Sequence, residues 1–137
     1  MGRVGRRPEE AAQGHASMIA VLDTCAVLSW LVERRPLPAV VGAGPRLVSA
    51  ITWYEIAWKH RAGRLPLPLP RDSWMASAMR LVTTVSVAAE TFLAAADLDW
   101  LHRDPADRLI VALAQDKNAR LVTCDRTIAA FYPRCIW

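Results

Sequence analysis

The sequence predicts an α/β fold, a three-layer α/β/α sandwich with a central parallel sheet. Short aliphatic and β-branched runs alternate with segments of helical periodicity, as expected of right-handed βαβ units. The first run, IAVL at residues 19–22, is apolar at every position, which is typical of a strand covered on both faces. A chain of 137 residues with 53% hydrophobic content is also long enough to bury the core of one domain.

The N-terminal half supplies the first two strand–helix pairs. Residues 1–17 carry almost no apolar pattern, so we expect a disordered N-terminal extension followed by a single domain at 18–137. Strands are expected at residues 19–22 and 47–50, and helices at 26–32 and 52–62. The sequence TWYE fits a capping box, which would make Thr52 the cap of the second helix and Glu55 its reciprocal partner.

The C-terminal half continues the alternation. The expected elements are a helix at 72–80, a β-rich run at 81–87, a helix at 88–98, a helix from residue 105, a strand at 121–124, a helix at 126–131 and an edge strand at 135–137. In the helix at 88–98 we expect Phe92, Leu93 and Ala96 to face inward. Asp104 and Pro105 suit the cap and first position of the next helix.

Composition excludes several classes of protein. No apolar run approaches the ~20 residues of a membrane span and no hydrophobic signal core precedes the domain, so a soluble cytoplasmic protein is expected. The three cysteines, Cys25, Cys124 and Cys135, fit no zinc pattern, and we expect reduced core residues. The net charge of +4 arises with 15 Arg against 2 Lys, which suits phosphate contacts, although a GC-rich genome would also encode a sequence rich in Ala and Arg.

Four carboxylates follow strands or open helices. Asp23 and Asp125 come directly after predicted strands, and Glu55 and Asp107 fall in the first turns of helices that begin at the same edge of the sheet. Like charges within ~4 to 6 Å raise one another's pKa unless a cation intervenes. Oxygen ligands suit Mg²⁺ or Mn²⁺, so the pattern predicts a metal site. Helix capping is the structural alternative for these acids, and for Asp23 taken alone it is the favoured one.

The chemistry that fits four acids best is metal-assisted attack of water on a phosphodiester. The sequence holds no GxxxxGK[ST] loop and no GxSxG elbow. Thr24 and Thr123 could support the site by hydrogen bonds to a carboxylate, although ordinary structural roles suit them equally.

The candidate contacts to a phosphate backbone are Lys59, His60, Arg61, Arg64, Arg108 and Arg126.

The chain resembles the PIN-domain ribonucleases, and more closely the VapC toxins of bacterial type II toxin–antitoxin systems. The resemblance rests on the motifs IAVLDTCAVLSWL, SAITWYEIAWKHRAGRLPLP, HRDPADRLIVALA and LVTCD and spans residues 18–137. It implies a Mg²⁺- or Mn²⁺-dependent endoribonuclease, with tRNA or rRNA favoured as substrate, a homodimer, and inhibition by a cognate VapB-like antitoxin. The family's acids fall on Asp23, Glu55, Asp107 and Asp125. Asp104 also matches, and we favour a capping role for it.

Two alternatives stay open. One is a PIN nuclease of RNA processing that has no antitoxin. The other is a non-catalytic module, binding nucleic acid or forming a dimeric interaction surface, in which the acids only cap helices.

Overall fold

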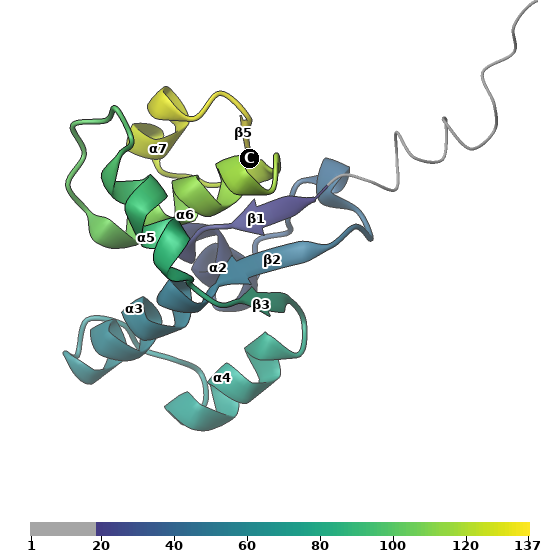
Figure 1. The fold of residues 1–137 in the computed structure, drawn as a ribbon. Helices are drawn as coiled ribbons and strands as arrows, with labels where there is room; N and C mark the ends of the chain where they lie inside the picture. Colours follow the sequence, from purple (N-terminus) through teal and green to yellow (C-terminus); the bar gives the residue numbers. More distant parts are fainter. Residues whose placement is uncertain (1–18) are drawn as a thin grey trace, which may run out of the picture.

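The computed structural model describes residues 19–137, so the extension expected at residues 1–17 lies outside the described part. Five parallel strands form one sheet in the order β3-β2-β1-β4-β5, with helices on both faces (Figure 1). The strands are β1 Ala20–Leu22, β2 Arg46–Ser49, β3 Thr83–Val85, β4 Arg120–Val122 and β5 Cys135–Ile136. The expected parallel α/β sandwich is therefore confirmed, with β5 at one edge of the sheet.

Six α-helices and one 3-10 turn connect the strands in the described part of the chain. They are α2 Thr24–Leu31, η1 Ala39–Val41, α3 Ala50–Arg61, α4 Arg71–Met79, α5 Ala89–Ala96, α6 Pro105–Asp116 and α7 Arg126–Phe131. No helix within residues 19–137 combines the length and the apolar character that a membrane crossing requires.

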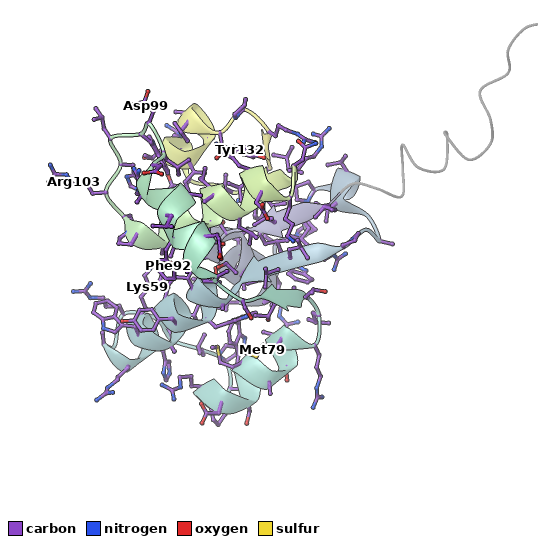
Figure 2. The ribbon with its side chains drawn as sticks, viewed as in Figure 1. Lys59, Met79, Phe92, Asp99, Arg103 and Tyr132 are labelled. Atoms are coloured by element: carbon purple, nitrogen blue, oxygen red, sulfur yellow. A yellow bond between two sulfur atoms is a disulfide. The ribbon has the colours of Figure 1, made fainter. Side chains whose placement is uncertain are left out.

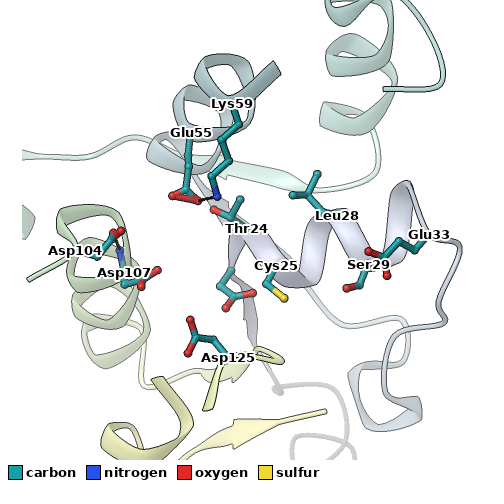
Figure 3. A pocket seen from close by; sticks show the side chains of 11 residues that line it. Thr24, Cys25, Leu28, Ser29, Glu33, Glu55, Lys59, Asp104, Asp107 and Asp125 are labelled. Carbon is teal, nitrogen blue, oxygen red and sulfur yellow. Dashed lines mark hydrogen bonds and ion pairs between the residues drawn. The ribbon is translucent and has the colours of Figure 1, made fainter. Parts of the chain in front are cut away.

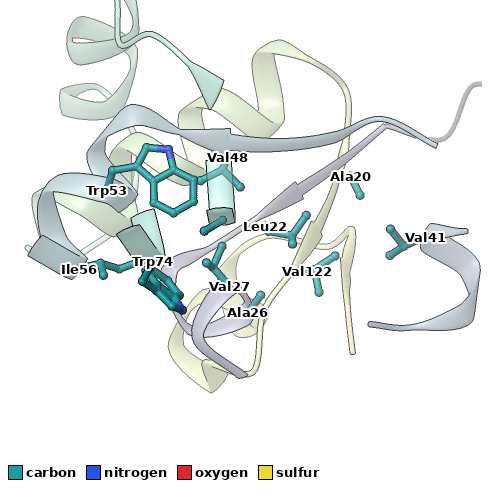
Figure 4. Packing of buried hydrophobic residues seen from close by; sticks show 11 residues of the cluster. Ala20, Leu22, Ala26, Val27, Val41, Val48, Trp53, Ile56, Trp74 and Val122 are labelled. Carbon is teal, nitrogen blue, oxygen red and sulfur yellow. The ribbon is translucent and has the colours of Figure 1, made fainter. Parts of the chain in front are cut away.

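Alternate residues of β1 serve the two faces of the sheet. Ala20 and Leu22 pack into a cluster with α2, α3 and α4, in which Trp53 and Trp74 are buried (Figure 4). Val21 points to the opposite face and packs against α6 and α7. Because both sides of β1 are covered, its sequence contains no polar residue.

Helix α6 begins as its sequence predicts. Asp104 is the cap, its Oδ1 accepting from the backbone N–H of Asp107 at 3.0 Å, and Pro105 is the first helical residue. The helix ends at Asp116, with Lys117 as its C-cap, and the chain turns away at Asn118, whose φ of 48° lies in the left-handed region that asparagine tolerates. The capped start of α6 fixes the position of Asp107 in its first turn.

The capping box expected at Thr52 and Glu55 is wrong. Helix α3 begins earlier, with Ser49 as its cap accepting from the backbone N–H of Ile51 at 3.3 Å. Thr52 is buried inside the first turn, where its hydroxyl lies 3.3 Å from that of Thr24. Glu55 is therefore a mid-helix residue and no part of a cap.

The inward face expected for α5 is also wrong. Phe92, labelled in Figure 2, is 53% exposed and Leu93 is 67% exposed, whereas Ala95 is buried. Ala95 packs with Leu109 and Ala112 of α6, and this contact places Ala95 on the buried face of the short helix. The two large apolar side chains are left on the surface.

The expectation of three reduced core cysteines is wrong for two of them. Cys25, in the first turn of α2, and Cys124, after β4, form a disulfide, while Cys135 is a free thiol. Cys124 is also exposed rather than buried. Two residues 99 positions apart meet because β1 and β4 are neighbours in the sheet.

Candidate active site

A cavity of about 370 Å³ opens where β1 and β4 end and α3 and α6 pass nearby (Figure 3). It brings together all four predicted carboxylates and Asp104. Its lining residues are Asp23, Thr24, Cys25, Leu28, Ser29, Glu33, Glu55, Lys59, Asp104, Asp107 and Asp125.

Asp23, which directly follows β1, is one of the residues that line this acidic cavity. Its Oδ1 accepts from the backbone N–H of Ala26 at 2.7 Å, which caps α2, and its Oδ2 accepts from the Thr123 hydroxyl. The residue is only 2% exposed. Burial raises its pKa from 3.8 to about 6, against the lowering effect of these two hydrogen bonds; the nearby charges of Asp107 and Asp125 add to the rise.

Thr123 couples Asp23 to the loop that carries Asp125. Besides donating to Asp23, the hydroxyl oxygen of Thr123 accepts from the backbone N–H of Asp125 at 2.9 Å. Asp125 in turn caps α7, its Oδ1 accepting from the backbone N–H of Thr127 at 2.8 Å. Two acids from different strands are thus held through one buried side chain.

Asp107 reaches the cavity from the first turn of α6. Its Oδ2 lies 2.7 Å from Nε2 of His102, a residue that the pattern of acids gave no reason to select. Burial raises the pKa of Asp107, and the hydrogen bond from His102 opposes that rise. Asp104, one turn earlier, lines the same cavity while capping the helix.

Glu55 and Lys59 approach from α3 and are separated by one helical turn. Lys59 Nζ lies 3.7 Å from Glu55 Oε1, and Figure 3 shows both side chains directed toward the other acids. The Glu55 side chain is 17% exposed and that of Lys59 is 41% exposed. Lys59 is therefore the predicted basic residue that lines the acidic cavity.

The remaining basic candidates do not line the acidic cavity. His60, Arg61 and Arg64 continue from the end of α3, and Arg126 is exposed beside Asp125. Arg108 differs, because all five of its N–H groups donate to backbone carbonyls. The acceptors are the carbonyl oxygens of Ala95, Ala96, Leu98, Trp100 and His102. No donor is left for a phosphate, so Arg108 drops out of the candidate RNA contacts.

The two supporting threonines have different partners. Thr123 bonds to Asp23, whereas the Thr24 hydroxyl contacts Thr52 and ties α2 to α3. Glu33, beyond the end of α2, is a further carboxylate on the cavity wall that the sequence did not single out. Only knowledge of which elements meet could have selected Glu33 or His102.

The donor set suits a hard divalent cation. Every acid on the cavity wall offers carboxylate oxygens. Burial is the main cause of the raised pKa of Asp23 and the charges of Asp107 and Asp125 add to it, and a bound cation would offset both effects. Within residues 19–137, however, no three His, Cys, Asp or Glu side chains already converge on a common metal position. The residue types therefore fit a metal, whereas binding would require side-chain adjustment.

Comparison with known proteins assigns the chain to a family. Residues 20–132 match the PIN domain model. Over 121 residues the chain is 34% identical to "Ribonuclease VapC22" of Mycobacterium tuberculosis (strain ATCC 25618 / H37Rv), covering 83% of this chain and 93% of that relative.

Solved structures share the fold at low sequence identity. The structure of VapBC2 from Rickettsia felis, bound to a DNA fragment from the promoter, matches with a TM-score of 0.66 and 17% identity over 87% of this chain and 96% of that one. PAE2754 from Pyrobaculum aerophilum matches with a TM-score of 0.60 and 16% identity over 90% and 91%. With the family model and the 34% identical relative, these findings show that the chain belongs to the PIN-domain family, as a homologue of the VapC ribonucleases.

Proposed function

We propose that the protein is a Mg²⁺- or Mn²⁺-dependent endoribonuclease and the toxin of a VapC-type toxin–antitoxin pair. The observation that carries the proposal is the acidic cavity, in which Asp23 is buried deeply enough to raise its pKa to about 6. A residue that only capped a helix could remain exposed, as Asp104 does. A carboxylate that is buried beside Asp107 and Asp125 and has a strongly raised pKa is instead typical of a functional site. A bound cation would compensate its charge.

Asp23, Asp107 and Asp125 would hold the metal, with Glu55 as a fourth ligand and Asp104 a weaker candidate. When bound, a divalent ion would lower the pKa of water and offset negative charge that develops on the phosphate. Thr123 links the two loops that follow β1 and β4, because its hydroxyl donates to the Asp23 carboxylate and accepts from the backbone N–H of Asp125. Lys59, beside Glu55, can bring a positive charge to a phosphate at the cavity wall.

Backbone phosphates farther from the cleaved bond would meet His60, Arg61 and Arg64 at the end of α3, and Arg126 at the start of α7. His60 and Arg61 lie on the helix that carries Glu55, Arg64 follows that helix, and Arg126 follows Asp125, so an RNA strand that crosses the cavity could contact basic residues on both sides. Resemblance to the toxins favours tRNA or rRNA as substrate. The positive net charge agrees with a polyanionic ligand.

The proposed partners would bind to apolar side chains that are exposed on α3 and α5. Tyr54 and Trp58 are 66% and 50% exposed and line a second cavity that shares Glu55 and Lys59 with the first. Phe92 and Leu93 are exposed on α5. Large apolar side chains that are exposed on a surface are typical of protein interfaces. We assign these exposed side chains to contacts with a VapB-like antitoxin and with a second copy of the chain.

The test is cleavage of total RNA and of purified tRNA and rRNA with Mn²⁺, with EDTA, and with single substitutions. We expect Asp23→Asn and Asp107→Asn each to lower the cleavage rate at least ~100-fold, since each removes a metal-binding charge. Asp116→Asn, at the far end of α6, is the matched control and should cleave as the original chain does.

Cleavage that continues unchanged in EDTA or in both substituted proteins would refute the mechanism. A folded chain that cleaves no RNA with Mn²⁺ would favour the non-catalytic alternative, which three of the acids support by capping helices: Asp23, Asp104 and Asp125. Cleavage without growth inhibition on expression would favour an RNA-processing nuclease.

A further inference from the structure

His102 contacts the carboxylate of Asp107, although His102 itself does not line the acidic cavity. It stands five positions before Asp107, outside α6, and its ring returns toward the first turn of the helix. The Nε2–Oδ2 distance of 2.7 Å is that of a strong hydrogen bond to a carboxylate. The two side chains are 27% and 20% exposed, so water competes little for this contact.

The position of His102 is itself fixed from two sides. Its ring centroid lies 4.7 Å from that of Trp100, which stacks on Phe131 with a 9° angle between the rings. Its backbone carbonyl accepts from Arg108 Nη1 at 2.9 Å. A histidine held by its ring and by its backbone can in turn hold a carboxylate.

Asp107 is correspondingly restrained at both ends. Its backbone N–H donates to the Asp104 carboxylate at 3.0 Å, and its Oδ2 receives the His102 N–H. No hydrogen bond to Oδ1 occurs within the described residues 19–137, and the residue lines the cavity that also contains Asp23 and Asp125. One oxygen is thus engaged in the protein while the other is available to a ligand.

We propose that His102 is a positioning residue of the metal site, which holds Oδ2 of Asp107 so that Oδ1 is presented to the cation. This inference rests on the proposed function and adds a residue that does not touch the metal or the RNA. A histidine N–H that orients a ligating carboxylate typically contributes 10- to 100-fold to metal affinity or activity, because the ligand no longer has to be ordered on binding.

The experiment compares His102→Leu with His102→Gln. Glutamine keeps an N–H donor of similar reach, whereas leucine keeps only bulk against Trp100. Mn²⁺ binding is measured directly, from the electron paramagnetic resonance signal of free Mn²⁺, and RNA cleavage is measured as a function of Mn²⁺ concentration. We expect His102→Leu to need about 10- to 100-fold more Mn²⁺ in both assays and His102→Gln to stay within about threefold of the original chain.

The maximal cleavage rate at saturating Mn²⁺ should be largely restored in His102→Leu, because the residue positions a ligand and takes no part in the chemistry. An unchanged Mn²⁺ requirement in His102→Leu would refute the inference, and so would an equal loss in both variants, which would assign the effect to ring packing. Asp107→Asn separates this failure from that of the proposed function. If the original chain and Asp107→Asn bind Mn²⁺ equally, the metal site itself is refuted.

Discussion

Asp23 shows how a single buried carboxylate can weaken the fold. Its carboxylate lies 2% exposed at the end of the central strand, where ionisation is opposed by burial and by the charges of Asp107 and Asp125. A rise in pKa from 3.8 to about 6 corresponds to a free energy of about 3 kcal/mol, at 1.36 kcal/mol per pKa unit. The hydrogen bonds from Ala26 and Thr123 already limit this penalty.

The sign of the pH dependence follows from that rise. The folded protein keeps the proton of Asp23 in a range of pH where the unfolded chain has lost it, so the free energy of unfolding falls as the pH rises from about 4 through about 6. An asparagine at this position could not ionise. We therefore expect Asp23→Asn without metal to be more stable than the original chain at pH 7.5, by up to about 3 kcal/mol, and equally stable near pH 4.

Urea unfolding at the two pH values measures this difference, with Asp116→Asn as a control that should show no change at either. If Asp23 holds the metal as proposed, Mn²⁺ should reverse the order at pH 7.5, because it would stabilise the chain that retains this carboxylate. Equal stability of Asp23→Asn and the original chain at both pH values would show that Asp23 is not strained by its burial.

At the scale of elements, Arg108 organises the loop between α5 and α6. Its guanidinium collects the carbonyl oxygens of Ala95 and Ala96, at the end of α5, and three more from residues 98, 100 and 102. A positive charge at a helix C-terminus complements the helix dipole, and the five bonds tie the end of α5 and the following loop to α6. The loop that carries His102 thereby becomes a defined structure.

Substitution of Arg108 should act on stability rather than on contacts with RNA. We expect Arg108→Ala to lower the free energy of unfolding by about 2–4 kcal/mol, because several carbonyls lose a charged donor at once. Arg108→Lys should rescue little, since an ammonium group cannot reproduce the planar arrangement of five donors. Arg80→Ala, on the exposed end of α4, is a matched control with little expected effect. Chemical unfolding of the three variants measures this.

A phosphate-binding role for Arg108 would give a different result. Weaker RNA binding at unchanged stability in Arg108→Ala would contradict the structural assignment. Hydrogen exchange offers a second measurement, because loss of the guanidinium should raise exchange in residues 97–104 before it affects the sheet.

The sequence predicts which segments form helices and strands. It often does not predict where these elements end or which of their faces is buried. The run at residues 19–22 predicts a covered strand and DPAD predicts the start of α6, because apolar continuity and capping are local properties. Ser49 and Thr52 both fit a helix cap, and only packing decides between them, since Thr52 is needed inside against Thr24. The face that α5 buries depends in the same way on Leu109 and Ala112, far along the chain.

At the scale of the whole molecule, the parallel sheet made the gathering of acids predictable. Strands that run in one direction release their following loops at one edge, so Asp23 and Asp125 had to approach each other if β1 and β4 were neighbours. The same adjacency brings together Cys25 and Cys124, yet the spacing of cysteines along the chain gives no sign of it. His102 was missed for a related reason: its role depends on a loop returning to α6.

The Cys25–Cys124 disulfide is a covalent link across the acidic end of the molecule. Cys25 follows Asp23 by two residues and Cys124 directly precedes Asp125, so the bond joins the two segments that carry these acids. It also closes a sequence separation of 99 residues. In the loop-closure model a bond over ~100 residues restricts the unfolded chain by up to about 4.7 kcal/mol, and measured effects are typically about 2–4 kcal/mol.

We expect the paired substitution Cys25→Ser with Cys124→Ser, or reduction by dithiothreitol, to lower the free energy of unfolding by about 2–4 kcal/mol in urea titrations. Cys135→Ser should change the free energy of unfolding little, because that thiol lies in the edge strand β5 and makes no covalent link.

A thiol count on the unfolded oxidised chain should find one reactive cysteine, rising to three after reduction. Three thiols before reduction, or equal stability with and without dithiothreitol, would contradict the link. If both measurements agree with it, then restraint of the Asp23 and Asp125 segments is covalent as well as hydrogen-bonded, and the Thr123 bridge acts between loops already held together.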